Sequence, residues 1–172
     1  MVRAAMEGTL AVGDAAESDV AALAALRTRV AERLTRDFGR GHWSAAVTEK
    51  GVARGLRTSR VLVARRGGGI VATLRLATQK PWAIDTAYFV RVRRALYLHD
   101  MAVEPDAQRG GLGRRLLEAA WRAARAWPAE AIRLDAYDAP AGAGGFYAKC
   151  GFREVGRVVY RKVGLIYFER LL

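Results

Sequence analysis

The chain has 172 residues, about half of them apolar, which suits a single folded domain and excludes a disordered or fibrous protein. No apolar stretch approaches the roughly 18–20 residues that a membrane-spanning helix needs, so we expect no membrane partner. The net charge of +12 would attract nucleic acid or phosphate-bearing ligands, but the 29 basic residues are spread along the chain.

Cysteine and histidine are scarce. Cys150 is the single cysteine, which excludes an intrachain disulfide and favours a reducing, cytoplasmic location. His42 and His99 are the two histidines, so we predict no metal site. Cys150 itself has no histidine near it in the sequence, and we interpret it as a buried apolar filler.

The N-terminal third predicts a strand and two helices. Residues 8–13 favour a short strand, and Asp14 or Ser18 can cap the helix that follows. That helix carries an apolar stripe and ends at Gly39 and Gly41. Residues 43–56 predict a second, weaker helix because two glycines dilute it. The stripe consists of Leu23, Leu26, Val30, Leu34 and Phe38.

The middle of the chain predicts a hairpin followed by an irregular connection. Residues 60–65 and 70–78 alternate and are rich in β-branched side chains, and Gly67–Gly69 lies between them as a turn. Residues 79–94 mix aromatic and basic side chains without a period. Residues 95–103 then predict a strand, which Pro105 ends.

The last third predicts a helix at 112–126, a strand at 131–137 and a short helix within 140–150. Residues 152–160 and 164–172 predict two closing strands. The strand–helix–strand order over 96–137 requires a right-handed crossover and a parallel strand pair. Because the other connections favour antiparallel pairs, the sequence predicts a mixed α/β sheet covered by helices.

A glycine-rich loop, QRGGLG at 108–113, joins the strand at 95–103 to the helix at 112–126. Backbone N–H groups at a helix start have no internal partners, and the helix dipole makes that end positive. Glycines let an anion approach the backbone closely. The loop therefore predicts a site for a diphosphate or a similar anion.

Three kinds of protein bind phosphates with such loops. A P-loop would need Gly-Lys-Ser or Gly-Lys-Thr, which is absent. A Rossmann loop needs the spacing G-x-G-x-x-G after the first strand, and this loop has neither the spacing nor the position.

The third kind of phosphate-binding protein is indicated by a resemblance to a known family. The loop Gln108–Gly113, the strand LHDMAVEP before it, and FYAKCGF at 146–152 together resemble the GNAT superfamily of acyl-CoA-dependent N-acyltransferases. The order of the predicted elements is similar too, and the resemblance covers essentially the whole chain.

The resemblance implies a fold and a cosubstrate. We expect residues 1–172 to form a single α/β (mixed, α+β-like) GNAT domain. Its central twisted sheet would be mixed and mostly antiparallel, splayed between its fourth and fifth strands and flanked by helices. Acetyl-CoA would be the cosubstrate. The resemblance assigns its binding to the strand residues Met101, Ala102 and Val103 and to the loop residues Gln108, Arg109, Gly110, Gly111, Leu112, Gly113 and Arg114.

The resemblance also implies catalytic residues. Tyr147 is the expected general acid, which hydrogen-bonds or protonates the departing thiolate; packing of the short helix is the alternative role. His99 and Asp100 are the candidate bases, with Glu104 and a water relay as competitors. Neighbouring strand residues face opposite sides, so His99 and Asp100 can face one acceptor only if a bulge re-aims one of them.

The acceptor is less defined by the sequence. Residues 79–94 carry aromatic side chains, Asp85 and several arginines, and they line the acceptor site or form a solvated connection. The leading hypothesis is acetylation of a primary amine of a small molecule or peptide by direct attack in a ternary complex. The alternatives are acylation of an RNA-linked or ribosomal amine and a regulatory module that binds acyl-CoA without turnover. A homodimer is open, because dimers are common in this family.

Overall fold

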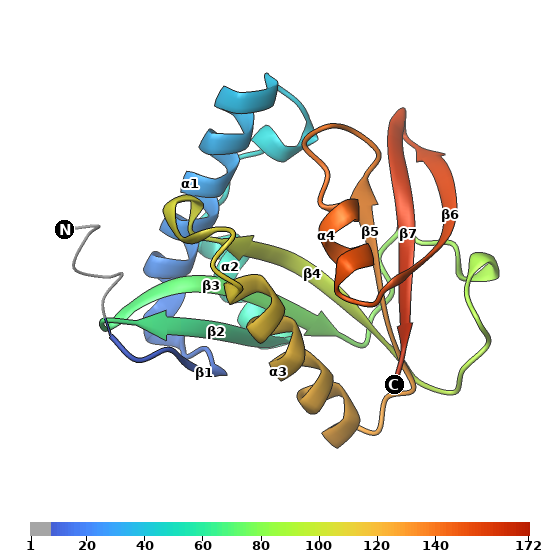
Figure 1. Ribbon diagram of the computed structural model, residues 1–172, viewed down its shortest axis with the longest axis horizontal. Helices are drawn as coiled ribbons and strands as arrows, with labels where there is room; N and C mark the ends of the chain where they lie inside the picture. The colour runs from blue at the N-terminus through green and yellow to red at the C-terminus, as the bar shows by residue number, and fades with distance from the viewer. Residues whose placement is uncertain (1–7) are drawn as a thin grey trace. The chain divides into compact units, whose positions relative to one another are not determined.

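A seven-stranded mixed sheet organises the chain. The computed structural model describes residues 8–172, and its hydrogen-bonded strand order is β1-β2-β3-β4-β5-β7-β6 (Figure 1). The β4–β5 pair is parallel, whereas the β1–β2, β2–β3, β5–β7 and β6–β7 pairs are antiparallel. The predicted mixed, mostly antiparallel sheet flanked by helices is confirmed. The strands are β1 (Ala11–Asp14), β2 (Arg60–Arg66), β3 (Gly69–Ala77), β4 (Ala95–Val103), β5 (Ala131–Tyr137), β6 (Arg153–Tyr160) and β7 (Val163–Leu171).

Four α-helices accompany these strands in the described part of the chain: α1 (Val20–Phe38), α2 (Glu49–Thr58), α3 (Leu112–Ala126) and α4 (Gly144–Lys149). Within residues 8–172, no helix is long and apolar enough to cross a membrane.

The residues form two compact units. Of the described residues, the first unit contains those from Gly8 to Leu76 together with His99–Ala120, and the second contains Ala77–Leu98 and Trp121–Leu172. Strand β4 and helix α3 contribute residues to both units. That the whole chain is one domain stays a prediction.

The first unit is built around β2 and β3. Successive strand residues point to opposite faces, and nearly all central residues of both strands are buried, so both faces are covered. In Figure 1, α2 lies behind these strands and the beginning of α3 lies in front of them. The core on the α1 and α2 side consists of Leu23, Ala24, Leu26, Val52, Val61, Val63 and Ile70.

A two-residue turn joins β2 and β3. Gly67 and Gly68 both have positive φ, 54° and 78°, as a type I′ hairpin turn requires. The predicted hairpin is confirmed, and glycine is needed there because other residues rarely adopt that conformation.

The second unit packs α4 against β5, β6 and β7. Figure 1 shows these three strands side by side, with α4 close to them. The β5–β7 register runs along the whole of β5, from Ala131↔Leu171 to Tyr137↔Leu165. Ile84, Phe89, Tyr97 and Tyr167 form a second apolar cluster here.

The parallel β4–β5 register covers the beginning of each strand. Ala95, Leu96 and Tyr97 pair with Ala131, Ile132 and Arg133, and both strands continue beyond these residues. The splay expected between the fourth and fifth strands stays a prediction.

Some predicted boundaries are wrong. The first strand begins at Ala11 rather than at residue 8. The second helix begins at Glu49 because the Thr48 hydroxyl accepts the Gly51 N–H at 3.1 Å and caps it, while His42–Ser44 form a separate 3₁₀ turn. The apolar stripe of α1 is buried only in its first half, and Phe38 at its end is 46% exposed.

Candidate active site

The glycine loop leaves β4 and opens α3 as the sequence predicts. After the 3₁₀ turn Pro105–Ala107, Arg109 and Gly111 take positive φ values of 65° and 77°, and Gly110 between them does not. Such an alternation of backbone handedness turns successive N–H groups toward one concave surface, which suits an anion. Arg109, Gly110 and Gly111 are exposed, so this surface faces solvent.

The first turn of α3 adds positive charge to that surface. It contains no acidic residue, although acidic residues are favoured at this position, and it carries the exposed Arg114 and Arg115 instead. Leu112, Leu116 and Leu117 are buried and anchor the helix. A firmly seated helix start with three arginines around it, counting Arg109, fits a diphosphate.

Gln108 has a different role from the loop glycines. Its side-chain amide donates to the Val103 carbonyl at 3.2 Å, which ties the loop back to the end of β4. At Gly111, a Cβ would meet no atom within 4 Å. Glycine is therefore required at 111 by the positive φ, and the space above it is open to a ligand.

Strand β4 has an irregular backbone just before Met101–Val103. Asp100 has a φ of +52°, a left-handed conformation that interrupts the alternation of a regular strand. An irregular backbone at this point is the condition under which His99 and Asp100 can face the same acceptor. Glu104 follows the strand, and its backbone N–H donates to the Val71 carbonyl at 2.8 Å.

His99 is an uncharged side chain near neutral pH. Burial lowers the pKa of its imidazole below the ordinary value, and the positive charge of Arg75 lowers it further against an opposing effect of Asp100. A neutral imidazole has a nitrogen that accepts a proton.

Asp100 and Glu104 are both engaged by arginines. One oxygen of Asp100 accepts Arg27 Nη2 at 2.9 Å, and the other accepts Arg75 Nε at 2.7 Å. Glu104 is held by the guanidinium of Arg29, with Nη2 at 2.7 Å. Because each oxygen of Asp100 already accepts a charged N–H group, this arrangement favours His99 over Asp100 as a proton acceptor.

Tyr147 lies on α4 in the second unit and is buried. Its ring packs edge-on against Phe152, with ring centroids 5.6 Å apart, and is tilted against the ring of Phe168, with centroids 6.1 Å apart. Burial raises the pKa of its hydroxyl well above the ordinary value, and Asp135 on β5 raises it further. The hydroxyl therefore keeps its proton and acts as a hydrogen-bond donor.

Hydrogen bonds fix the connection at 79–94 within the second unit. The Tyr167 hydroxyl accepts the Asp85 N–H at 3.1 Å and donates to the Ala83 carbonyl. The Val90 N–H donates to Glu169, while the Val90 carbonyl accepts from Arg133. Phe89 is buried, and Trp82 is 88% exposed. Of the two roles predicted for this segment, these contacts favour a connection with aromatic side chains packed beneath it, although the connection is not wholly solvated.

The sequence analysis missed several charged residues. Asp135 raises the pKa of Tyr147, and the single acidic residue of the strand AIRLDAY could have identified it. Arg27 and Arg75 meet at Asp100 although 48 positions separate them in the sequence. A charge inside the apolar strand at 70–78 was the available indication for Arg75. Cys150 is buried, as predicted.

The sequence profile of the acetyltransferase (GNAT) domain matches residues 57–154, which is more than half of the chain. The protein therefore belongs to the GNAT acetyltransferases, enzymes that use acetyl-CoA as the acyl donor. No curated protein matches the sequence closely enough to count as a relative.

Solved structures share the fold. A ribosomal-protein-alanine N-acetyltransferase from Brucella melitensis has a TM-score of 0.72 and 21% identity, covering 94% of this chain and 99% of that one. The ribosomal-protein-S18-alanine N-acetyltransferase from Escherichia coli has a TM-score of 0.71 and 19% identity, with coverages of 95% and 94%. The Salmonella typhimurium protein yncA, solved with its cofactor acetyl-CoA, has a TM-score of 0.69 and 18% identity, with coverages of 95% and 94%.

Proposed function

We propose that the protein transfers an acetyl group from acetyl-CoA to a primary amine of a small molecule or peptide, by direct attack within a ternary complex. The observation that carries the proposal is the glycine loop, with its alternating backbone, open Gly111 and arginine-rich helix start. These features suit the pyrophosphate of coenzyme A, with N–H groups from about Arg109 to Arg114 as donors. Arg109, Arg114 and Arg115 add charge.

The donor's pantetheine arm would lie along Met101–Val103. An extended ligand can pair with the edge of a strand through main-chain hydrogen bonds, and a backbone N–H there would polarise the thioester carbonyl. The amine nitrogen then bonds to the acetyl carbon, the carbon–sulfur bond breaks, and the thiolate leaves. Acetyl-CoA supplies the activated acyl group, and the protein supplies position and proton control.

Tyr147 and His99 take the two proton roles. The Tyr147 hydroxyl would stabilise the departing thiolate by a hydrogen bond, and its raised pKa makes full proton transfer the less favourable course. His99, neutral near pH 7, would take the proton that the amine loses, directly or through a water molecule. Asp100 was the other candidate base, and its two arginine contacts suit a positioning role better.

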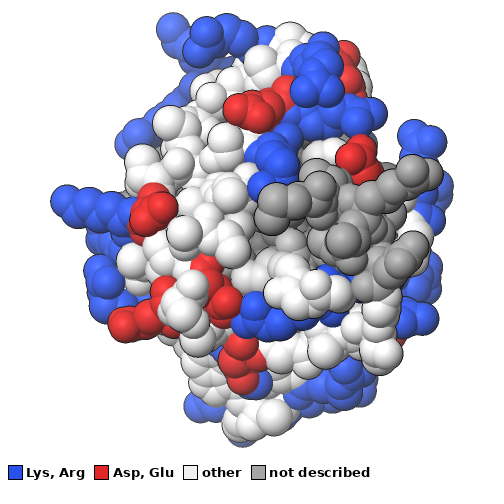
Figure 2. Space-filling view, turned by 90° about the vertical axis from the view of Figure 1, so that its left-hand side faces the viewer, with Lys and Arg blue, Asp and Glu red and all other residues white. Residues whose placement is uncertain are grey.

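One face of the protein bears charges of both signs, which supports a small-molecule or peptide acceptor. On the described part of the face drawn in Figure 2, lysine and arginine side chains lie scattered with acidic side chains among them. Two similar structures come from enzymes named for a ribosomal-protein alanine, so peptide N-termini belong among the acceptors to be tested.

The test is thiol release from acetyl-CoA with a panel of amines and N-terminal peptides, with the wild-type protein and Tyr147→Phe in parallel. We expect turnover with at least one acceptor class and a large loss in the variant. Binding of acetyl-CoA without turnover on any amine would identify a regulatory module instead. Salt-sensitive binding of tRNA at micromolar concentration or below would favour an RNA-linked acceptor.

A further inference from the structure

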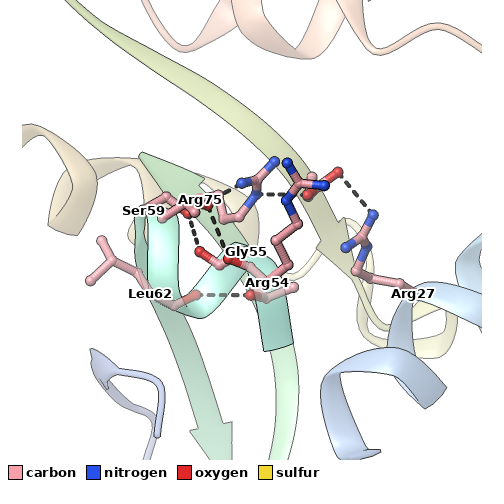
Figure 3. Close-up of polar contacts among 9 residues, drawn as sticks. Arg27, Arg54, Gly55, Ser59, Leu62 and Arg75 are labelled. Atoms are coloured by element: carbon pink, nitrogen blue, oxygen red, sulfur yellow. Dashed lines mark hydrogen bonds and ion pairs between the residues drawn. The ribbon is translucent and has the colours of Figure 1, made fainter. Parts of the chain in front are cut away.

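Two arginines from different elements bind one carboxylate in the first unit, and the side chain of a third arginine extends toward one of them. Arg27 comes from α1, Arg54 from α2 and Arg75 from β3, and Asp100 lies on β4. Arg27 and Arg75 each donate to one oxygen of Asp100, at 2.9 Å and 2.7 Å. Figure 3 shows the side chain of Arg54 extending from α2 toward Arg75. Asp100 thus lies between two guanidinium groups, and the cluster of three arginines with one carboxylate has an excess of positive charge.

The arginine beside the strand is fixed in place before any ligand arrives. Arg75 Nε donates to Asp100, and Arg75 Nη1 donates to the Ser59 hydroxyl at 3.2 Å. The Ser59 hydroxyl in turn donates to the Gly55 carbonyl, which fixes its orientation (Figure 3). A guanidinium held by two partners loses little side-chain entropy when it binds an anion, so the site is preorganised.

A small cavity lies among these residues. Its volume is about 20 Å³, enough for a group the size of one water molecule. Apolar side chains form part of its wall, and Arg27, Arg75 and Asp100 are its charged lining. The exposed fractions of these three side chains are 26%, 24% and 30%. Charges at this depth are screened less than fully exposed ones, but a ligand from solvent can still reach them.

The cluster adjoins the segment proposed to hold the donor. Asp100 directly precedes Met101, and consecutive strand residues advance by about 3.3 Å. The left-handed backbone at Asp100 marks the same point of the strand. An acceptor whose amine reaches the thioester beside Met101–Val103 would therefore have its neighbouring groups within reach of the arginines.

We propose that Arg27, Arg54 and Arg75 form a carboxylate-binding subsite, so that the acceptor is an amine that carries a carboxylate near its amino group. Guanidinium groups bind carboxylates through paired N–H donors, and Arg27 and Arg75 each use one donor on Asp100. Asp100 is then a positioning residue that holds Arg27 and Arg75 side by side. This inference rests on the proposed acetyltransferase function and narrows its substrate class.

Matched acceptors test the inference. The panel contains amino acids with their amides, and peptides that differ only by Glu or Gln after the first residue; the two sets distinguish a free amino acid from an acidic peptide. We expect kcat/KM to favour the acid over its amide by about tenfold or more, because hydrogen bonds to charged groups are strong. In Arg27→Gln and Arg54→Gln that ratio should fall toward one.

Two control variants match these substitutions. Arg33→Gln removes an arginine of α1 that pairs with Asp37 on the surface, and Arg57→Gln removes an exposed arginine of α2. Both should keep the wild-type ratio between acid and amide. Acetyl-CoA should stabilise all four variants as it does the wild type, because none of the substitutions lies in the glycine loop.

Asp100→Asn separates a positioning residue from a base. If Asp100 is a positioning residue, the substitution should mainly raise the KM of the acid acceptor. An equal fall of kcat on acids and amides, together with loss of the acidic limb of the pH profile, would make Asp100 the base and overturn its positioning role.

The failures of the inference and of the proposed function are distinguishable. Turnover without an acid preference, or a preference that Arg27→Gln and Arg54→Gln leave intact, overturns the proposed subsite. The proposed acetyltransferase function then still stands. A stronger preference for amines that carry a phosphate ester overturns the carboxylate assignment. If no amine in the panel turns over, glutamate and succinate are titrated against their amides by NMR. Carboxylate binding that Arg27→Gln and Arg54→Gln abolish supports the subsite, and no carboxylate binding overturns it.

Discussion

The glycine loop at 108–113 and the connection at 79–94 are both irregular, but they are held in opposite ways. The loop is shaped by its own backbone, through positive φ at Arg109 and Gly111, and is held by its own side chains Gln108 and Leu112. The connection at 79–94 is fixed by side chains of other elements, because Tyr167 and Glu169 on β7 accept its backbone N–H groups. The loop has the exposed residues Arg109, Gly110 and Gly111 at its centre, whereas the connection has several of its N–H groups bonded within the protein.

This difference separates a binding segment from a scaffold segment. Buried polar groups need partners, so a connection that packs on a core must have its backbone satisfied internally. A segment that binds an anion needs N–H groups that a ligand can reach. Substitutions at the loop should therefore change acetyl-CoA binding more than stability, and substitutions under 79–94 should change stability most.

The largest effect is expected where the connection is anchored. Glu169 accepts Arg133 Nε at 3.0 Å and the Val90 N–H, and both charged side chains are almost fully buried. Glu169→Gln leaves the charge of Arg133 without its partner, so urea unfolding should show a loss of about 3–5 kcal/mol. Glu154→Gln, which breaks an exposed pair with Arg157, is the control and should cost far less, because exposed pairs contribute little. Similar losses of stability in Glu169→Gln and Glu154→Gln would contradict the role of Glu169 as an anchor of the connection.

Tyr147 combines both kinds of role, and Tyr147→Phe separates them. The ring still packs against Phe152 and Phe168, so the free energy of unfolding should change by about 1 kcal/mol or less. The hydroxyl is lost, so kcat should fall about a hundredfold or more. Steady-state kinetics and denaturant unfolding measure the two effects. A variant with unchanged kcat would leave Tyr147 as a packing residue alone.

At the loop, Gly111→Glu should abolish stabilisation by acetyl-CoA. Ligand at about a hundred times its dissociation constant stabilises a protein by about 2.7 kcal/mol, and a carboxylate at 111 would repel the phosphates. Gly111→Gln has the same size and the same backbone strain without the charge. Thermal unfolding with and without acetyl-CoA should therefore show a larger residual shift for Gln than for Glu. Equal shifts in Gly111→Glu and wild type would place the cofactor elsewhere.

The smallest effect on stability is expected at Asp19, a buried acid of the first unit, and its dependence on pH tests the cause. Arg65 lowers the pKa of Asp19, and the Ala16 N–H, which donates to Asp19 at 2.7 Å, contributes in the same direction. A lowered folded-state pKa stabilises the protein above the unfolded-state value and loses that effect as pH falls through the folded-state value. Asp19→Asn should cost about 1–2 kcal/mol at pH 7 and much less below about pH 3. A cost that does not change with pH would exclude the ion pair as its source.

The parts that the sequence predicted well are those governed by local pattern. The Gly67-Gly68 turn, the glycine loop and the start of α3 follow from residues that lie next to one another in the chain. Tyr147 was identified by the FYAKCGF motif, but its burial beside Asp135 depends on packing. The meeting of Arg27 and Arg75 at Asp100 depends on how α1, β3 and β4 come together. No local period encodes that arrangement, so the sequence could name Asp100 but not its partners.

The most direct test of the central claim is thermal unfolding of the wild-type protein with increasing acetyl-CoA. The loop geometry predicts stabilisation that rises with concentration and reaches about 2.7 kcal/mol at a hundred times the dissociation constant. No change in unfolding at millimolar acetyl-CoA would contradict the assignment of the glycine loop to the coenzyme, and the acetyltransferase function proposed for this chain with it.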